Sequence, residues 1–102
     1  MTNSIELCNV KDVKEGEMKP FDIEGKQIMI VNRSGKFFAV DRICTHAEAD
    51  LSDGFLNEDS VVCPLHLSAF NLSDGHPTNP PATRPIRTYK IKIENNKISV
   101  EV

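Results

Sequence analysis

Hydrophobic and polar residues alternate in short runs along most of the chain, a pattern that is typical of β-strands. The segment "KQIMIVNRSGKFFAVDR" holds two strand-like runs joined by a glycine-containing turn, which predicts a β-hairpin. Near the end, "RTYKIKIENNKISVEV" alternates on both sides of its paired asparagines and predicts a second hairpin. No stretch has a helical period, although "HAEADLS" could form a single turn. The pattern therefore predicts an all-β fold.

The region between the two predicted hairpins has a different character. Within it, "DGFLNEDSVVC" predicts two short strands around a turn. The later segment "HPTNPPATRP" has four prolines in nine residues, and proline lacks a backbone donor, so we expect a stiff surface loop there and not the interior of a sheet. The simplest organisation is a single domain, residues 1–102, with a sandwich or partly open barrel base (residues 1–42 and 72–102) and a small metal-carrying subdomain inserted between strands (residues 43–71).

Length and composition agree with one compact domain. The chain has 102 residues, 39% of them hydrophobic. No apolar run approaches the roughly 20 residues of a membrane-spanning helix, and the start "MTNSIELC" does not have the pattern of a signal peptide. We therefore expect a cytoplasmic, soluble protein with no membrane partner.

The net charge of −3 argues against nucleic acid as a partner. Acidic residues are concentrated in residues 41–60, which hold six acids and one base, Arg42. This stretch is either a solvated loop or an acidic docking rim for a basic partner. A docking rim would speed encounter more than it would tighten binding.

Four residues have the spacing of a metal site: Cys44, His46, Cys63 and His66. They form C-x-H, then sixteen residues, then C-x-x-H, and such ligands argue for zinc or an iron–sulfur cluster. A zinc finger with two cysteines and two histidines usually has its cysteines paired first and its histidines later. Here each motif supplies one of each, which suits a two-iron cluster with thiolates on one iron and imidazoles on the other.

With these motifs, the sequence closely resembles the Rieske family, specifically the small soluble Rieske-type ferredoxins. The resemblance covers nearly the whole chain, including the two Cys/His motifs, the proline-rich segment and the C-terminal hairpin. It implies a Rieske-like base fold and one [2Fe–2S] cluster. In that cluster Cys44 and Cys63 would hold the inner iron, and His46 and His66 the outer, solvent-facing iron.

Histidine ligation has a consequence for charge. Two thiolates cancel the two positive charges of an oxidised [2Fe–2S] core, so the oxidised site would be neutral and the reduced site would carry one negative charge. An all-cysteine site would be more negative in both states and harder to reduce. This accounts for the range of roughly −150 to +300 mV that Rieske centres cover.

The departures from high-potential members predict a low potential within that range. The positions where those proteins carry two further, disulfide-bonded cysteines hold Ala49 and Leu65 here. Of the two hydroxyl-bearing residues that follow the last ligand in those proteins, the serine is present as Ser68, and the tyrosine is replaced by Phe70. Ser68 is either a donor to the cluster or a plain loop serine.

Several other positions bear on the site. Leu67 stands where the family often has glycine, and Asn71 where it often has aspartate. We interpret Cys8 as a small buried hydrophobe on a strand and His76 as a loop residue next to a proline. The pair Pro80 and Pro81 matches the family's proline loop, which covers one side of the cluster; Gly54 and Gly75 are expected to supply turns with unusual backbone angles.

The resulting hypothesis is a one-electron carrier and not an enzyme. The sequence has no nucleotide-binding glycine motif and no credible catalytic triad. By the resemblance, the protein would take electrons from a ferredoxin reductase and pass them to a terminal oxygenase. It would bind both transiently as a monomer, through a small patch around His46 and His66. Two alternatives remain: the Rieske-like small subunit of a larger oxidoreductase such as nitrite reductase, which typically lacks the cluster ligands, and a binding module with structural zinc.

Overall fold

The computed structural model describes residues 4–45, 49–65, 67–80 and 82–101. Its described residues form strands and two short 3-10 helices, η1 (Val10–Asp12) and η2 (Leu51–Asp53). The strands are β1 (Ser4–Asn9), β2 (Met18–Ile23), β3 (Lys26–Arg33), β4 (Lys36–Asp41), β5 (Phe55–Asn57), β6 (Ser60–Val62), β7 (Ala69–Asn71), β8 (Pro77–Asn79), β9 (Thr88–Tyr89), β10 (Ile91–Glu94) and β11 (Lys97–Glu101). The predicted all-β fold is confirmed. No helix within the described ranges is long and apolar enough to cross a membrane.

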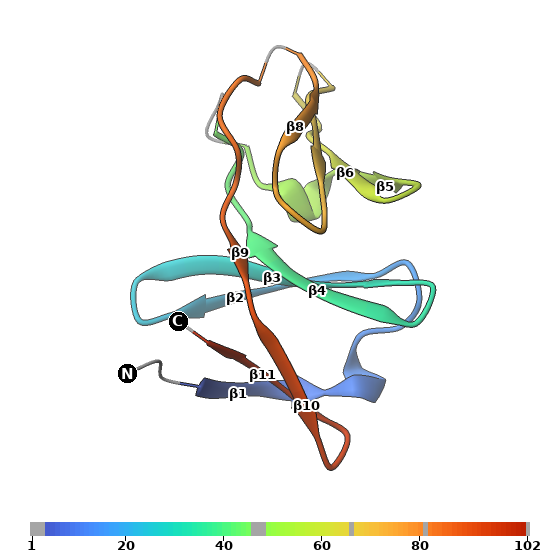
Figure 1. Cartoon of the computed structure of the whole chain (residues 1–102), viewed down its shortest axis with the longest axis vertical. Coiled ribbons are helices and arrows are strands. Elements are labelled where there is room, and N and C mark those ends of the chain that lie inside the picture. The colour runs from blue at the N-terminus through green and yellow to red at the C-terminus, as the bar shows by residue number, and fades with distance from the viewer. Residues whose placement is uncertain (1–3, 46–48, 66, 81, 102) are drawn as a thin grey trace.

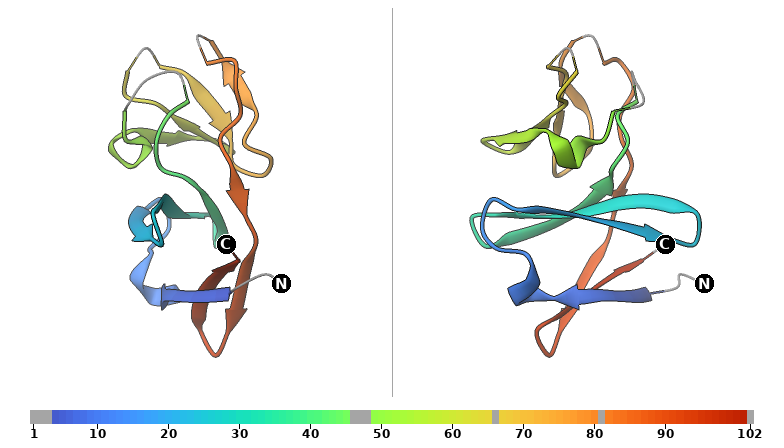
Figure 2. Two further views of the ribbon diagram at one scale, coloured as in Figure 1. Left: turned by 90° about the vertical axis from the view of Figure 1, so that its left-hand side faces the viewer. Right: turned by 180° about the vertical axis from the view of Figure 1, so that it is seen from behind.

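The strands form three antiparallel sheets, stacked along the long axis of the molecule (Figure 1). The first sheet has the order β1-β11-β10, and the second has the order β2-β3-β4-β9. These two face each other and make the base of the fold, while the third sheet, β5-β6-β7-β8, lies at the opposite end (Figure 2). The second sheet is therefore the middle layer.

The middle position of the second sheet explains its most apolar strand. Residues 28–31 of β3 are all fully buried. Met29 and Val31 belong to the hydrophobic cluster shared with the third sheet, whereas Ile28 and Ile30 belong to the cluster shared with the first sheet. A strand covered on both faces has no polar side, which is why "IMIV" does not alternate.

Both predicted hairpins are confirmed. Strand β3 pairs with β4, and β10 pairs with β11. The turn residues of the second hairpin, Asn95 and Asn96, have φ angles of 51° and 63°. Ser34 and Gly35 have φ angles of 55° and 82° in the first hairpin. Two successive positive φ values define the turns whose twist matches that of a hairpin, and asparagine and glycine adopt them most readily.

The third sheet contains the two short strands that the sequence predicted, β5 and β6, which turn at Glu58. The proline-rich segment is not entirely a loop, however, because Pro77–Asn79 form strand β8 beside β7. This strand is at the sheet edge, where a residue without an N–H group is tolerated. The sheet thus extends beyond residue 71. The division into a base and a subdomain of residues 43–71 stays a prediction.

Both glycines expected to have unusual backbone angles do have them. Gly75 has a φ of 78°, in the left-handed region, and a Cβ atom there would lie 2.1 Å from the carbonyl oxygen of Ile86. Gly54 has a φ of −87° and a ψ of −149°, outside the helical and extended regions. It also has a steric requirement, since a Cβ atom there would lie 1.9 Å from the carbonyl oxygen of Val62. Val62 precedes Cys63, so this close approach packs η2 against the start of the second Cys/His motif.

We expect Gly54→Ala to lower the free energy of unfolding by about 3 kcal/mol, because backbone atoms must shift to accept the methyl group. Gly16→Ala is the matched control. Its Cβ would meet nothing within 4 Å, so only the cost of a φ of 83° remains, about 1 kcal/mol. Urea denaturation of the three proteins measures the difference, and equal losses for the two variants would contradict the steric explanation.

Candidate metal centre

The structure places both predicted cysteine ligands in the interior, beneath two surface loops. Cys44 is 4% exposed and Cys63 is fully buried. Both belong to the hydrophobic cluster that joins the second and third sheets, together with Phe70 and Leu72. The fold therefore places two cysteines that are nineteen positions apart in the sequence within one buried cluster.

The first loop is closed by backbone hydrogen bonds at its base. The Cys44 N–H donates to the Ala49 carbonyl at 2.9 Å, and the Leu51 N–H donates to the Arg42 carbonyl at 2.6 Å. Ile43 and Asp50 form an isolated antiparallel bridge between these bonds. Cys44 therefore lies at the base of a narrow loop that returns at Ala49.

The second loop is built in the same way. The Cys63 N–H donates to the Ser68 carbonyl at 2.6 Å, which closes the base of this loop. Leu65 and Leu67, on the described part of its tip, are 48% and 56% exposed. The second loop therefore runs from a buried cysteine outward, and a group bound to Cys63 would extend from the core towards the surface.

His46 and His66 lie outside the described residues, so the structure does not place them. In the sequence, each comes two or three positions after its cysteine and before the residue that closes its loop. Within the described ranges, no three His, Cys, Asp or Glu residues gather into a group that could hold a metal ion. A complete donor set for the two cysteines therefore depends on His46 and His66.

Arg42 anchors the first loop to the base. Its side chain, 16% exposed, contacts the carboxylates of Asp22 on β2 at 3.1 Å and Asp50 at 2.9 Å. Asp50 also caps η2 by accepting a hydrogen bond from the Ser52 N–H at 2.9 Å. The arginine thereby connects a base strand, the ligand loop and the following helical turn.

Ser68 is the only fully buried polar side chain among the described residues. Its Oγ accepts a hydrogen bond from the Ala82 N–H at 3.0 Å. A hydroxyl that accepts in this way keeps its own proton for donation. Ser68 thus has a donor available in the buried region that contains Cys63, whereas Phe70 is buried without any hydroxyl group.

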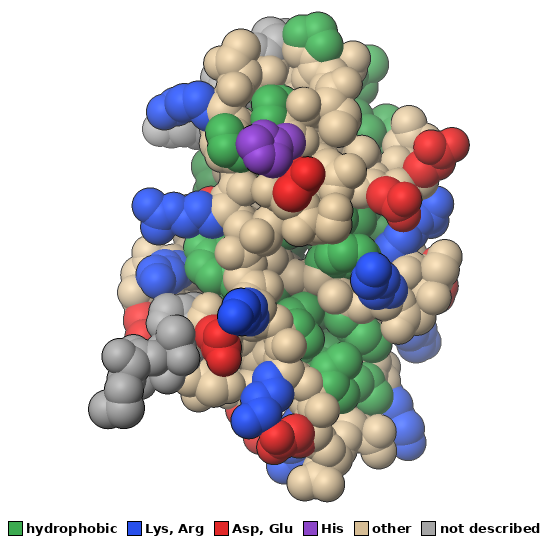
Figure 3. All heavy atoms as spheres, viewed as in Figure 1, with side chains coloured by type: hydrophobic (Ala, Val, Ile, Leu, Met, Phe, Trp, Pro, Cys, Tyr) green, Lys and Arg blue, Asp and Glu red, His purple; other side chains and the backbone are tan. Residues whose placement is uncertain are grey.

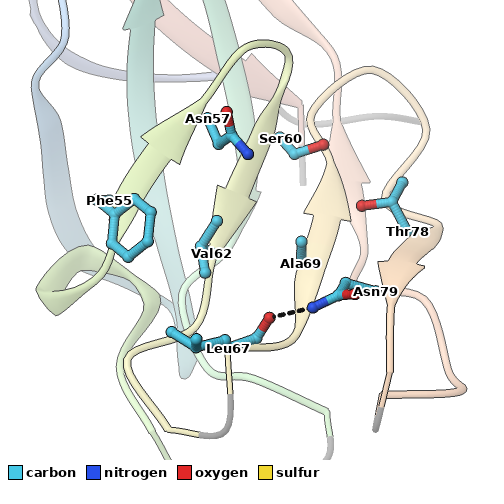
Figure 4. Close-up of a pocket in the computed structure, with 8 residues that line it drawn as sticks. All are labelled: Phe55, Asn57, Ser60, Val62, Leu67, Ala69, Thr78 and Asn79. Atoms are coloured by element: carbon cyan, nitrogen blue, oxygen red, sulfur yellow. Dashed lines mark hydrogen bonds between the residues drawn. The ribbon is translucent and has the colours of Figure 1, made fainter.

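Leu67 has a feature that sequence analysis missed. Its φ is 58°, in the left-handed region that non-glycine residues rarely adopt. This conformation gives a physical reason for the glycine that the family often has there. Leu67 borders a groove of about 400 Å³ on the outer face of the third sheet (Figure 4).

Of the two residues outside the motif, His76 lies in a loop as interpreted, whereas Cys8 lies on a strand as interpreted but is only partly buried. His76 is exposed in the turn before β8. Cys8 lies half-buried on β1, where desolvation, together with the nearby Asp12 carboxylate, raises the pKa of its thiol. Neither belongs to the region of Cys44 and Cys63.

The described part of the chain thus combines two buried cysteines, each at the base of a loop, with an all-β scaffold that has no helix longer than one turn. The family model described as "Rieske [2Fe-2S] domain" matches residues 3–90, and the chain belongs to this family.

Similar proteins and solved structures indicate which kind of Rieske protein the chain resembles. The chain is 35% identical over 98 residues to the ferredoxin component of the naphthalene 1,2-dioxygenase system of Pseudomonas putida, covering 96% of this chain and 94% of the relative. It is 38% identical over 101 residues to the 3-phenylpropionate/cinnamic acid dioxygenase ferredoxin subunit of Escherichia coli (strain K12), covering 98% and 94%. A solved complex of reduced oxygenase and oxidized ferredoxin in carbazole 1,9a-dioxygenase matches with a TM-score of 0.91 and 27% identity, covering 96% of this chain and 92% of the other.

The expected resemblance is thus confirmed: the chain is a Rieske-type ferredoxin, an electron-transfer component and not itself a catalyst, with one [2Fe–2S] cluster as its cofactor. The small-subunit alternative has weaker support. A nitrite reductase small subunit from Mycobacterium tuberculosis matches with a TM-score of 0.90 but only 19% identity, which shows a shared fold alone. The family match over residues 3–90 likewise leaves structural zinc without support.

We expect Ser68→Ala to lower the reduction potential by about 40 mV, the equivalent of one hydrogen bond that stabilises the reduced, more negative state. Ser73→Ala is the matched control, because Ser73 is exposed and its hydroxyl donates to Asn71 instead. Protein-film voltammetry compares the variants. An unchanged potential in Ser68→Ala would show that Ser68 is only a structural acceptor for Ala82.

Proposed function

We propose that Cys44 and Cys63 bind the inner iron of the cluster and that His46 and His66 bind the outer iron. The observation that supports this proposal is the common plan of the two loops, each closed at its base by a backbone hydrogen bond from the N–H of a buried cysteine. The donor set also fits in charge. Two thiolates would neutralise the oxidised core, and a neutral group is the kind that an apolar cluster accepts without a large desolvation cost.

The protein carries one electron at a time from a ferredoxin reductase to a terminal oxygenase. The dioxygenase ferredoxins among its relatives and the solved oxygenase–ferredoxin complex support this direction. The bound cluster supplies the one-electron acceptor. The chain excludes water from the thiolates by burying them, and its second loop presents Leu65 and Leu67 to a partner.

The charges of the chain are separated between the two ends of the molecule. All twelve Lys and Arg residues lie outside residues 43–83, and these residues hold six of the fifteen acids. On the face shown in Figure 3, basic side chains lie mostly over the two base sheets. Residues 43–83 therefore hold six acids and no base, and Arg42 and Arg84 are the flanking cations that the described contacts bring to the first ligand loop. This excess of negative charge favours partners with a basic surface and orients the loops towards them during encounter.

We further propose a cytoplasmic location, a monomeric state, and a division into a base and a cluster-binding subdomain of residues 43–71. The separate third sheet supports the last, with β8 as an added edge strand.

Ligand substitutions test the proposed site. We expect Cys44→Ser, Cys63→Ser, His46→Ala and His66→Ala each to yield protein that lacks the intact cluster. Cys8→Ser and His76→Ala are matched controls from elsewhere in the chain, and they should retain two iron atoms and two sulfides per chain. Iron and acid-labile sulfide analysis, with visible absorbance, gives the result. Cluster loss in the controls, or full retention in any ligand variant, would refute the assignment.

The exposed tip residue Leu67 tests the docking patch. Because its φ of 58° suits glycine, Leu67→Gly removes the side chain without demanding a new backbone conformation. We expect the rate of electron transfer to the oxygenase to fall about fivefold at limiting ferredoxin, the value of one lost apolar contact, with little change in potential. Ile93→Gly is the control, since Ile93 is also exposed (47%) but lies on β10 of the base. Equal effects of both variants would contradict a patch at the ligand loops.

A further inference from the structure

The proline-rich segment is hydrogen-bonded to both ligand loops. The Thr45 hydroxyl of the first loop donates to the Arg84 carbonyl at 2.7 Å, and the Arg84 Nη2 donates back to the Thr45 carbonyl at 2.9 Å. These bonds form a reciprocal pair between residues that are 39 positions apart in the sequence. Thr45 is the residue between Cys44 and His46, so the pair acts on the backbone of the first motif itself.

The same segment contacts the second loop at two points. The Asn79 Nδ2 donates to the Leu67 carbonyl at 2.7 Å, which Figure 4 shows as a dashed line. The Ala82 N–H donates to the Ser68 hydroxyl at 3.0 Å. Within six residues, from Asn79 to Arg84, the segment therefore makes polar contacts with both loops.

The segment is itself fixed in place. Ala82 and Ile86 are 6% and 2% exposed, and both belong to the buried cluster that contains Cys44 and Cys63. The Ile86 N–H donates to the Gly75 carbonyl at 3.0 Å. Pro80 and Pro85 restrict the backbone between these points, since proline fixes φ. Because this segment is anchored in the core and bonded to both loops, it can hold the two loops at a fixed distance from each other.

No disulfide bond can hold the two ligand loops together. The chain has three cysteines, two of them proposed ligands, and Cys8 lies on β1 of the base. A disulfide between the ligand loops would require a cysteine that the sequence does not have.

We infer that Asn79, Ala82 and Arg84 together form a strap that fixes the two ligand loops relative to each other, with Thr45 and Arg84 as positioning residues for the redox centre. This inference rests on the proposed ligand set. The strap maintains the spacing of the two Cys/His pairs, so it slows cluster loss and keeps the ligand geometry uniform from molecule to molecule.

The test uses the cluster-loaded protein and compares Thr45→Val with Thr83→Val. Both substitutions replace a hydroxyl by a methyl group in or beside the strap, but no hydrogen bond of the Thr83 hydroxyl is seen among the described residues, and Thr83 is exposed. We expect Thr45→Val to lose its cluster to a chelator about fivefold faster, the value of one hydrogen bond, and to broaden the EPR lines of the reduced state. Thr45→Ser should restore both properties, and Thr83→Val should match the unaltered protein.

A Thr45→Val protein with the chelator sensitivity and linewidths of Thr83→Val would overturn the strap. If Thr45→Val takes up no cluster, Arg84→Ala decides, because Arg84 is exposed and its loss leaves the core intact. Lys90→Ala is its control, because Lys90 is an exposed cation outside the strap. Faster cluster loss in Arg84→Ala than in Lys90→Ala supports the inference, and equal rates of loss in the two variants overturn it. Failure of the unaltered protein to bind any cluster would instead overturn the proposed site, and the strap with it.

Discussion

The structure depends on the burial of two cysteines from separate loops in one apolar cluster. Thiolates are poor occupants of such a place unless a cation compensates them. Residues 43–83 contain no Lys or Arg, and the flanking Arg42 and Arg84 are engaged with carboxylates and with the Thr45 carbonyl. A bound metal group would compensate the thiolates directly. A [2Fe–2S] core with two thiolates and two neutral imidazoles meets that requirement when oxidised and exceeds it by a single negative charge when reduced. Because the net charge changes by only one unit between two tolerated states, such a site suits a one-electron carrier.

The rest of the fold supports those two loops. The first sheet covers one face of the second, and the third sheet covers the other, so the second sheet is a rigid floor under Cys44 and Cys63. Arg42 fixes the first loop to β2 through Asp22, and the contact of Gly54 with Val62 fixes the approach to the second. The proline-rich segment then joins the two loops to each other, because it is hydrogen-bonded to both. A reduced cluster near the surface would add to the negative charge of the same end of the molecule, which strengthens the attraction to basic partners.

Features encoded by neighbouring residues could be predicted from the sequence. The two hairpins follow from alternation and from turn residues that accept a positive φ, and the Cys/His motifs are complete within a few positions each. Features that depend on contacts between distant segments could not be predicted from the sequence. Pairing of Pro77–Asn79 with β7, the steric need for Gly54 and the bonds between Thr45 and Arg84 all depend on chain segments meeting in three dimensions. The left-handed conformation of Leu67 was missed because leucine gives no local signal for it.

The central claim is that sulfur and nitrogen ligands from both loops share one pair of iron atoms. Electron–nuclear double resonance on the reduced protein tests it most directly, because the unpaired spin couples to directly bound nitrogen nuclei. The account predicts strong couplings from two histidine nitrogens, with loss of one coupling when only His46 or only His66 is replaced by cysteine. A reduced cluster with no strongly coupled nitrogen would contradict the account.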